Sequence, residues 1–405
     1  MTSKWKDIGP GIVIAATGVG AGDLIAAAVG GARYGSTILW AAVIGALFKW
    51  VLEEGLARWQ LATGTTILEG WATRLPKFVS IGFLIYLFFW GFIVAGALMA
   101  ACGLAAHALY PGVPVHVWGA VHAVAAAVLV LFGRYKHLET IMKFLIGLMF
   151  VVIMVSAFRA APPPAEVLVG LIIPKIPSGS IPFLLGVIGG VGGSVTLLSY
   201  GYWIRERGWT QPRDLPRVRL DVTVAYVLTG IFGVAIMVIS AGVQPQVVSG
   251  SKMVLGVADH LGELAGPMAR WLFLTGFWGA VFSSMLGVWQ GVPYLFADYL
   301  NVSSGQDSGK KVDTRSKAYR FFLFYLAVPP MVLLLFDKPV LVVIIYAIFG
   351  ALFMPFLAGL LLYMNSKRKW MGDLVERTGG KIMLALAVLL FLALFVLEVF
   401  RRLGG

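Results

Sequence analysis

Two glycine-rich strings are the places in this sequence where backbone groups could act on a ligand. Residues 18–23 read GVGAGD and residues 190–195 read GVGGSV, and each string stands inside a long apolar stretch. Glycine disfavours helix, and an interrupted helix exposes carbonyl oxygens that bind cations and N–H groups that attract anions. We therefore expect both strings to be helix breaks that line a binding site, which includes Gly20, Gly22, Gly193 and Ser194.

Asp23 is the sharpest candidate for direct contact with a ligand. It closes the first string and has no basic residue within four positions. An ionised carboxylate inside an apolar segment is costly and usually faces a cavity or a partner. The alternative is that Asp23 accepts hydrogen bonds from backbone amides freed by the break.

Among the other acidic residues, only Glu53 and Glu54 lie clearly inside an apolar stretch. Each has a basic residue four positions away on the same helix face, Lys49 for Glu53 and Arg58 for Glu54. This spacing favours side-chain ion pairs. We therefore expect Glu53 and Glu54 to be structural.

The sequence contains no arrangement typical of an enzyme. Its five histidines are scattered without HExxH spacing, and neither a serine–histidine–acid arrangement nor a GxxxxGK[ST] phosphate loop is present. A single cysteine, Cys102, excludes a disulfide framework within the chain and a multi-cysteine metal site. We predict a protein that is not an enzyme and has no cofactor, and that uses an ion gradient or the gradient of its own ligand.

The composition places the chain in a lipid bilayer. Hydrophobic residues make up 59% of it and charged residues 13%, and the mean hydropathy is +0.88, whereas soluble domains carry roughly 25% charged residues. The net charge of +13 comes from lysines and arginines clustered between long apolar runs, which is typical of topology signals. We predict one all-α polytopic membrane domain, residues 1–405, with no nucleic-acid ligand and no obligatory protein partner.

Eleven apolar stretches are long enough to cross a bilayer, because a spanning helix needs about 20 residues. Numbered as spans 1 to 11, their limits are 8–33, 36–62, 77–109, 114–133, 138–160, 180–205, 219–242, 266–298, 319–336, 338–364 and 380–402. Most lysines and arginines between spans fall on one side if the N-terminus is cytoplasmic. The positive-inside rule therefore predicts a cytoplasmic N-terminus, in the plasma membrane.

The two glycine-rich strings also indicate an internal repeat. Five spans separate them, so the second unit begins on the opposite side of the membrane, which makes an inverted repeat of about 8–160 and 180–364 with an extra helix at about 380–402. In transporters built this way, paired glycine-interrupted helices point to the substrate site. Small residues also serve tight helix packing, but two matched strings favour paired discontinuous helices.

Three stretches of the chain resemble the Nramp family of divalent-metal transporters. They are GPG at 9–11, LARWQLATG at 56–64 and MPFLAGLLLYMNSKRKWMG at 354–372. The resemblance implies a LeuT-type fold of two inverted five-helix repeats plus an eleventh helix. It also implies a central site between spans 1 and 6, where the carbonyls of Thr17 and Gly190 match positions that bind metal in the family.

The site motifs of the family are altered in this chain. The span 1 motif Asp-Pro-Gly-Asn falls on residues 20–23, so the first metal-binding carboxylate is missing and Asp23 replaces an asparagine. The span 6 motif Met-Pro-His falls on residues 193–195, GSV, and the proton-carrying acids of span 3 fall on Trp90, Ala97 and Ala100. Losing a thioether and an imidazole favours hard ions over softer transition metals.

The leading hypothesis is a secondary transporter for a divalent metal cation such as magnesium or manganese. Asp23 and the carbonyls of Thr17 and Gly190 would hold the metal, and proton coupling would be weak or absent because span 3 lacks acids. The alternative is a transporter of a small organic solute such as an amino acid, since the glycines open room and backbone amides can hold a carboxylate. A membrane scaffold or sensor is a third class, in which matched breaks would have no use.

Overall fold

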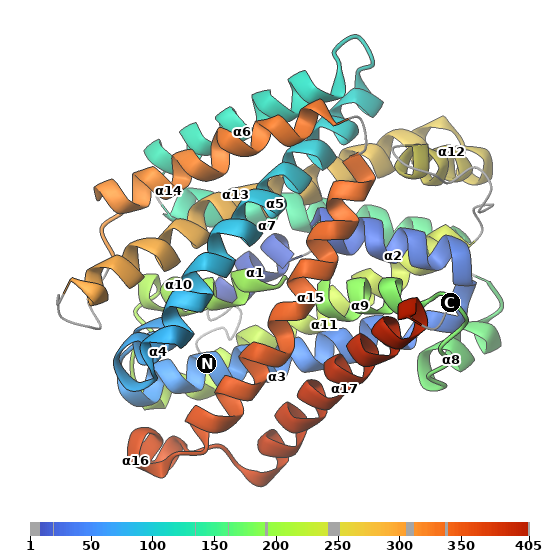
Figure 1. The fold of residues 1–405 in the computed structure, drawn as a ribbon. Helices are drawn as coiled ribbons and strands as arrows, with labels where there is room; N and C mark the ends of the chain where they lie inside the picture. The colour runs from blue at the N-terminus through green and yellow to red at the C-terminus, as the bar shows by residue number, and fades with distance from the viewer. Residues whose placement is uncertain are drawn as a thin grey trace, which may run out of the picture.

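Long apolar segments fold into helices in a bilayer because each backbone N–H and C=O is then satisfied within its own segment. The structure of the chain, a computed structural model, describes residues 9–18, 20–133, 135–160, 162–190, 193–241, 252–304, 312–336 and 339–403. Each of the eleven predicted spans coincides with helical structure (Figure 1). Span 1 consists of two helices, α1 (Pro10–Gly18) and α2 (Ala21–Tyr34), and span 6 of α9 (Ile181–Gly190) and α10 (Tyr200–Glu206).

Each of the other spans of both halves contains one main α-helix. In the first half they are α3 (Trp40–Thr63), α5 (Lys77–Leu109), α6 (Val115–Phe132) and α7 (Tyr135–Ala160). In the second half they are α11 (Leu215–Ala241), α13 (Pro267–Ser303), α14 (Lys317–Ala327) and α15 (Pro339–Asn365), followed by α17 (Thr378–Leu403). Figure 1 shows α17 on the outside of the molecule, where it packs on α15 and α3.

Short helices between the spans were not predicted from the sequence. They are α4 (Ile67–Arg74), α8 (Pro164–Ile172), α12 (Lys252–Ala265) and α16 (Arg368–Met371). Span 9 also departs from a single helix, because the α-helix ends at Ala327 and a 3₁₀ helix follows over Pro329–Leu335. Pro329 and Pro330 lack the backbone N–H that would continue α-helical bonding, which explains the change.

The outer surface is apolar, as expected of a protein in lipid. Phe78, Phe132, Phe144 and Phe158 are each at least 70% exposed on α5, α6 and α7, and water would disfavour so much exposed aromatic surface. By length and apolar composition, eight helices in the described ranges could each cross a membrane, or up to ten if each bent pair counts as one span. The predicted class, an all-α polytopic membrane protein, is confirmed.

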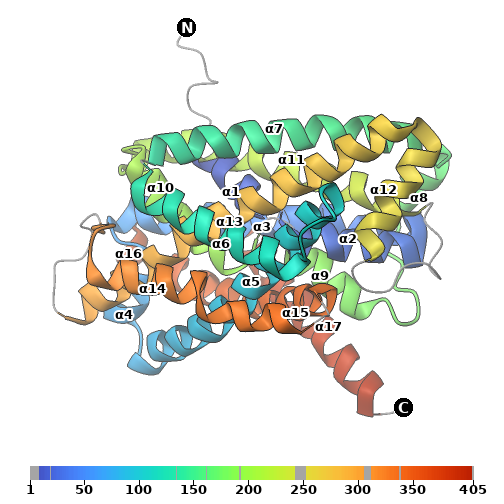
Figure 2. The ribbon, with the colours of Figure 1, turned by 90° about the horizontal axis from the view of Figure 1, so that it is seen from above.

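The interrupted helices lie in the interior of this bundle. Helix α1 packs among α7, α11 and α13 (Figure 2). Helix α9 packs against α2, α3 and α15, and its residues from Leu184 to Gly190 are all buried. The long helices thus surround both breaks with protein. Inside a membrane, irregular backbone is tolerated only where it is buried in protein or lines a water-filled cavity.

Asp221 on α11 fixes the start of α1. Its carboxylate accepts hydrogen bonds from the N–H of Gly9 at 2.9 Å, from the N–H of Gly11 at 2.5 Å and from the Tyr200 hydroxyl at 2.9 Å. Gly11 lies so close to the Asp221 backbone that a Cβ on it would overlap the Asp221 carbonyl. One fully buried carboxylate therefore ties both interrupted spans to α11.

Asp221 and Asp298 are buried acids that the sequence analysis passed over, because both lie near the ends of predicted spans. Asp298 near the end of α13 accepts hydrogen bonds from Thr66 at 2.8 Å and from Tyr202 at 2.6 Å. Thr66 caps the short helix α4 and Tyr202 lies in α10, so Asp298, like Asp221, joins short helical segments to a long helix. Both acids therefore have a structural use.

We predict that Asp221→Ala lowers the free energy of unfolding by at least about 3 kcal/mol, because each of three buried donors left without an acceptor costs about 1–3 kcal/mol. Asp221→Asn keeps one acceptor oxygen and should cost less. Thermal unfolding of the purified protein in detergent measures both. Asp259→Asn, which removes a carboxylate that is 56% exposed and paired with Arg270, is the control and should change stability by less than about 1 kcal/mol. Equal melting temperatures for Asp221→Ala and the control would contradict this role.

Candidate functional site

The break in span 1 lies between Gly18, where α1 ends, and Ala21, where α2 begins. Gly20 occupies the N-cap of α2 without a side-chain cap, and its N–H bonds the Gly18 carbonyl at 2.8 Å. A Cβ on Gly20 would overlap the Ser284 side chain of α13. Close packing against α13 therefore explains the glycine at position 20.

Serines of α13 bind the carbonyls that the first break releases. The Ser284 hydroxyl donates to the Thr17 carbonyl at 2.6 Å, and the Ser283 hydroxyl donates to the Ala16 carbonyl at 3.2 Å. The Thr17 hydroxyl itself turns back to the Val13 carbonyl at 2.7 Å. The Thr17 side chain is therefore used within α1, and its carbonyl is the group available to a ligand.

Gly22 and Asp23 fall in the first turn of α2, and their side-chain surroundings lie outside what the structure describes. Their backbone positions place them immediately after the break. The predicted contact of Asp23 with a ligand stays a prediction.

The break in span 6 follows Gly190, where α9 ends. The Gly193 N–H donates to the Gly190 carbonyl at 2.8 Å, and Gly193 has φ +88°, a conformation that favours glycine. From Val195 the chain continues as a 3₁₀ helix to Ser199 before α10 begins. Both spans are thus interrupted at the glycine-rich strings, as predicted.

The two breaks face each other. A Cβ on Gly193 would lie 3.5 Å from the Cα of Gly18, so the backbones of the two interruptions are in close contact. Ser194 is almost fully buried, and its hydroxyl accepts a hydrogen bond from the Trp90 indole N–H of α5 at 3.1 Å. Trp90, at a position where the resemblance expected an acid, therefore packs directly on the second break.

Lys49 of α3 reaches the second break, a contact that the sequence analysis missed. Its ammonium donates to the Gly189 carbonyl at 2.7 Å and to the Gly193 carbonyl. Glu53, the partner expected for Lys49, accepts a hydrogen bond from the Tyr226 hydroxyl at 3.0 Å. The Lys49 charge also acts on Glu53, as the i,i+4 spacing predicted, but that spacing gave no sign of the contact with the second break.

The second predicted pair is confirmed. Arg58 contacts Glu54 at 2.5 Å and also Glu376 at 3.2 Å, beyond the end of α16. Burial raises the pKa of the Glu376 carboxyl, and the Arg58 guanidinium opposes this shift. Arg219 adds a further contact to Glu54 at 2.9 Å, so these charges form a structural network away from the breaks.

The helix ends at the two breaks place partial negative charge there, and at the second break the Lys49 ammonium offsets part of it. α1 and α9 both end here, and the C-terminal end of a helix carries partial negative charge on its last carbonyls. Within the described residues, no three His, Cys, Asp or Glu side chains come together as a metal-binding group. A cation bound at the breaks would therefore depend on backbone carbonyls, with Asp23 as the adjacent carboxylate.

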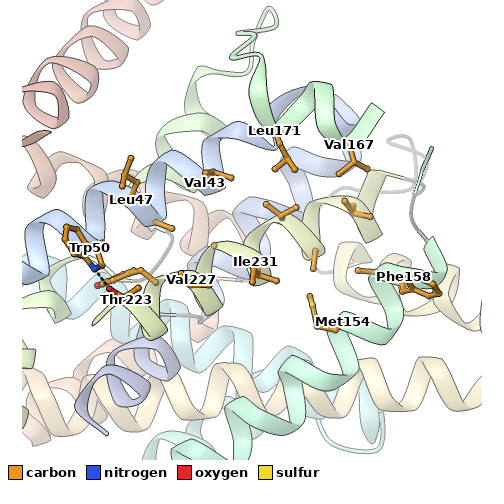
Figure 3. Close-up of a pocket in the computed structure, with 17 residues that line it drawn as sticks. Val43, Leu47, Trp50, Met154, Phe158, Val167, Leu171, Thr223, Val227 and Ile231 are labelled. Atoms are coloured by element: carbon orange, nitrogen blue, oxygen red, sulfur yellow. Dashed lines mark hydrogen bonds between the residues drawn. The ribbon is translucent and has the colours of Figure 1, made fainter. Parts of the chain in front are cut away.

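A separate apolar groove lies on the flank of the molecule, between α3, α7, α8 and α11 (Figure 3). Its volume is about 910 Å³, and it is lined by residues such as Leu47, Phe158, Leu171 and Ile231. None of the predicted site residues is among its lining in the described chain. We therefore place the candidate site at the breaks and not in this groove.

Comparison with known proteins gives a consistent family assignment. A model of the natural resistance-associated macrophage protein-like family, Nramp, matches residues 11–401. The chain is 25% identical over 248 residues to the divalent metal cation transporter MntH of Mesorhizobium japonicum, covering 58% of this chain and 54% of that protein. It is 28% identical over 186 residues to the metal transporter Nramp5 of Oryza sativa subsp. japonica, covering 42% of this chain and 33% of that protein. These alignments span between a third and just over half of the relatives' length.

A solved structure supports the fold over the full chain. The crystal structure of a mutant manganese transporter of Eremococcus coleocola matches with a TM-score of 0.77 and 17% sequence identity, covering 100% of this chain and 89% of that one. At this identity the match bears on the fold alone. It confirms the predicted LeuT-type fold.

We predict that Gly193→Ala destabilises the protein by at least about 1–2 kcal/mol, the cost of a left-handed backbone conformation for a residue with a Cβ. The added Cβ would also overlap the Thr196 hydroxyl. Gly82→Ala on α5 is the matched control, since no atom lies within 4 Å of its added Cβ, and it should be neutral or stabilising. Thermal unfolding of the two variants beside the parent measures the difference. A Gly193→Ala protein as stable as Gly82→Ala would rule out the described geometry of the break.

Proposed function

This chain belongs to the natural resistance-associated macrophage protein-like (Nramp) family, and on that premise we propose that it carries a divalent metal cation across the membrane by alternating access. The main supporting observation is that α1 and α9 both end in mid-bundle and that Gly18, the last residue of α1, lies against Gly193 in the second break, inside a chain that matches the family over residues 11–401. The names of the relatives favour a metal over an organic solute. The proposed activity moves its substrate unchanged, with no catalytic step.

We propose that Asp23 and the carbonyls of Thr17 and Gly190 provide the metal ligands. Among the described residues, the Thr17 carbonyl accepts a hydrogen bond from Ser284, and the Gly190 carbonyl accepts one from the Gly193 N–H. A carbonyl oxygen has two lone pairs, so one remains for a cation on each. Oxygen ligands of this kind suit hard ions such as magnesium or manganese.

The remaining site residues shape the space around the metal. Gly20 allows the first break to pack closely on Ser284 of α13, Gly193 lies against Gly18 of the first break, and the Ser194 hydroxyl accepts a hydrogen bond from Trp90. Gly22 belongs to the same proposal through its place beside Asp23 in the sequence. These residues would set the size of the site, and Asp23 its charge.

We propose that proton coupling is weak or absent. In span 3, Trp90, Ala97 and Ala100 are buried and cannot carry protons, whereas proton relays in membranes are built from acidic and histidine side chains. Two of the buried acids elsewhere, Asp221 and Asp298, bind three and two donors respectively in structural contacts. Metal uptake should therefore proceed without stoichiometric proton movement.

We predict that Asp23→Asn lowers manganese uptake into proteoliposomes at least tenfold, a loss of about 1.4 kcal/mol of interaction. The change removes the charge and keeps the size of the side chain, so folding should be preserved. The control is Asp259→Asn, which removes an exposed carboxylate and should transport as the parent does. Unchanged uptake by folded Asp23→Asn would refute the cation site.

A pH-sensitive dye in the same vesicles tests proton coupling. Acidification of the vesicle interior in proportion to manganese uptake would refute uncoupled transport.

The chain is a multi-pass membrane protein, and we propose that it lies in the plasma membrane with its N-terminus in the cytoplasm. The support is the positive-inside distribution of its lysines and arginines. A reporter fused to the N-terminus that is active only outside the cytoplasm should be silent. Activity of that reporter would reverse the orientation.

A further inference from the structure

Lys49 is a fully buried lysine at the centre of the bundle. Its side chain lies within α3 at 0% exposure, and a buried ammonium is expensive unless fixed polar groups compensate for its lost hydration. Gly45, one turn earlier on α3, permits the contact that positions it, because a Cβ there would lie 3.1 Å from the Ile188 Cα of α9. The close packing of α3 on α9 therefore aims Lys49 at the second break.

The groups that receive the ammonium are the carbonyls that the break releases. Gly189 lies in the last turn of α9 and Gly193 in the interruption after it, on either side of Gly190. The end of a helix is where a positive charge is favourable. Glu53, one turn along α3, adds a carboxylate nearby, held by the Tyr226 hydroxyl. The span 6 break is thus a cation-binding environment, and a side chain of the protein supplies the cation.

The first break is built differently. Its carbonyls on Ala16 and Thr17 are bound by the neutral hydroxyls of Ser283 and Ser284. A metal that approaches from this side meets no positive charge from these donors. At the second break the same metal meets the Lys49 ammonium, which repels it and competes for the carbonyls.

We propose that Lys49 is the resident cation of the span 6 break and a specificity-determining residue of the transport site. The Gly190 carbonyl, the proposed metal ligand, stands in the chain between the two carbonyls that Lys49 binds, so the ammonium repels a substrate cation there until the Lys49 side chain withdraws from Gly189 and Gly193. Lys49 therefore lowers the affinity of the site for divalent metal and restricts which cations enter it. This inference rests on the proposed site between the two breaks.

The test measures manganese binding to the purified protein by calorimetry. Lys49→Met keeps the length of the side chain and removes the charge, and its dissociation constant for manganese should fall at least tenfold below that of the parent. Lys49→Gln removes the charge but keeps an N–H donor for a carbonyl, and should also bind more tightly. Lys49→Arg keeps the charge and should bind as weakly as the parent.

The matched control is Lys143→Met, which removes a lysine from α7 where it pairs with Glu139 at 2.6 Å. Its manganese affinity should equal that of the parent. If Lys49 only caps α9, then Lys49→Met and Lys49→Gln lose thermal stability and gain no affinity, and the proposal fails. It also fails if neither uncharged variant folds, because the charge is then required by the fold.

Failure of the proposed function has a different signature. A parent that neither binds nor transports manganese, beside a Lys49→Met protein that binds it, would refute metal transport by the parent and support the role of Lys49. Absence of manganese binding in the parent and in both uncharged variants would overturn the inference itself.

Discussion

The structure depends on one constraint, which is that a helix interrupted inside a bilayer must find partners for the backbone groups it frees. No water is available in the hydrocarbon region, and each unsatisfied group costs several kcal/mol. At the first break the partners are Ser283 and Ser284 of α13. At the second they are the Gly193 N–H and the Lys49 ammonium. Helix α13 packs beside α1 and helix α3 beside α9, where each supplies one of these partners.

The donors that bind the freed carbonyls differ in charge between the two breaks. The two sides of the site therefore differ in their attraction for a cation. Hydroxyl groups satisfy the carbonyls of α1 without adding charge, so that end remains attractive to a cation. An ammonium satisfies the carbonyls of α9 and neutralises part of their attraction. A divalent cation between the breaks would therefore be held from the α1 side, beside Asp23, and opposed from the α9 side.

The buried acids distribute the remaining polar contacts among the helices. Asp221 holds the start of α1 and Tyr200 to α11, and Asp298 joins Thr66 and Tyr202 to α13. Span 3 carries no acid at the corresponding depth and presents Trp90 to Ser194. These two acids are therefore used in contacts between helices, and span 3 offers no acid to carry a proton in the proposed transport.

The sequence by itself determined the features that depend on residues close together in the chain. Apolar length set the spans, glycine content set the two breaks, and i,i+4 spacing set the Arg58–Glu54 pair. Only the tertiary structure decided which side chains satisfy the breaks, because Lys49 meets Gly189 across 140 positions and Ser284 meets Thr17 across 267. Such contacts leave no periodic signal in the sequence, since a lone lysine or a pair of serines in an apolar helix fits several partners equally well until the helices are packed.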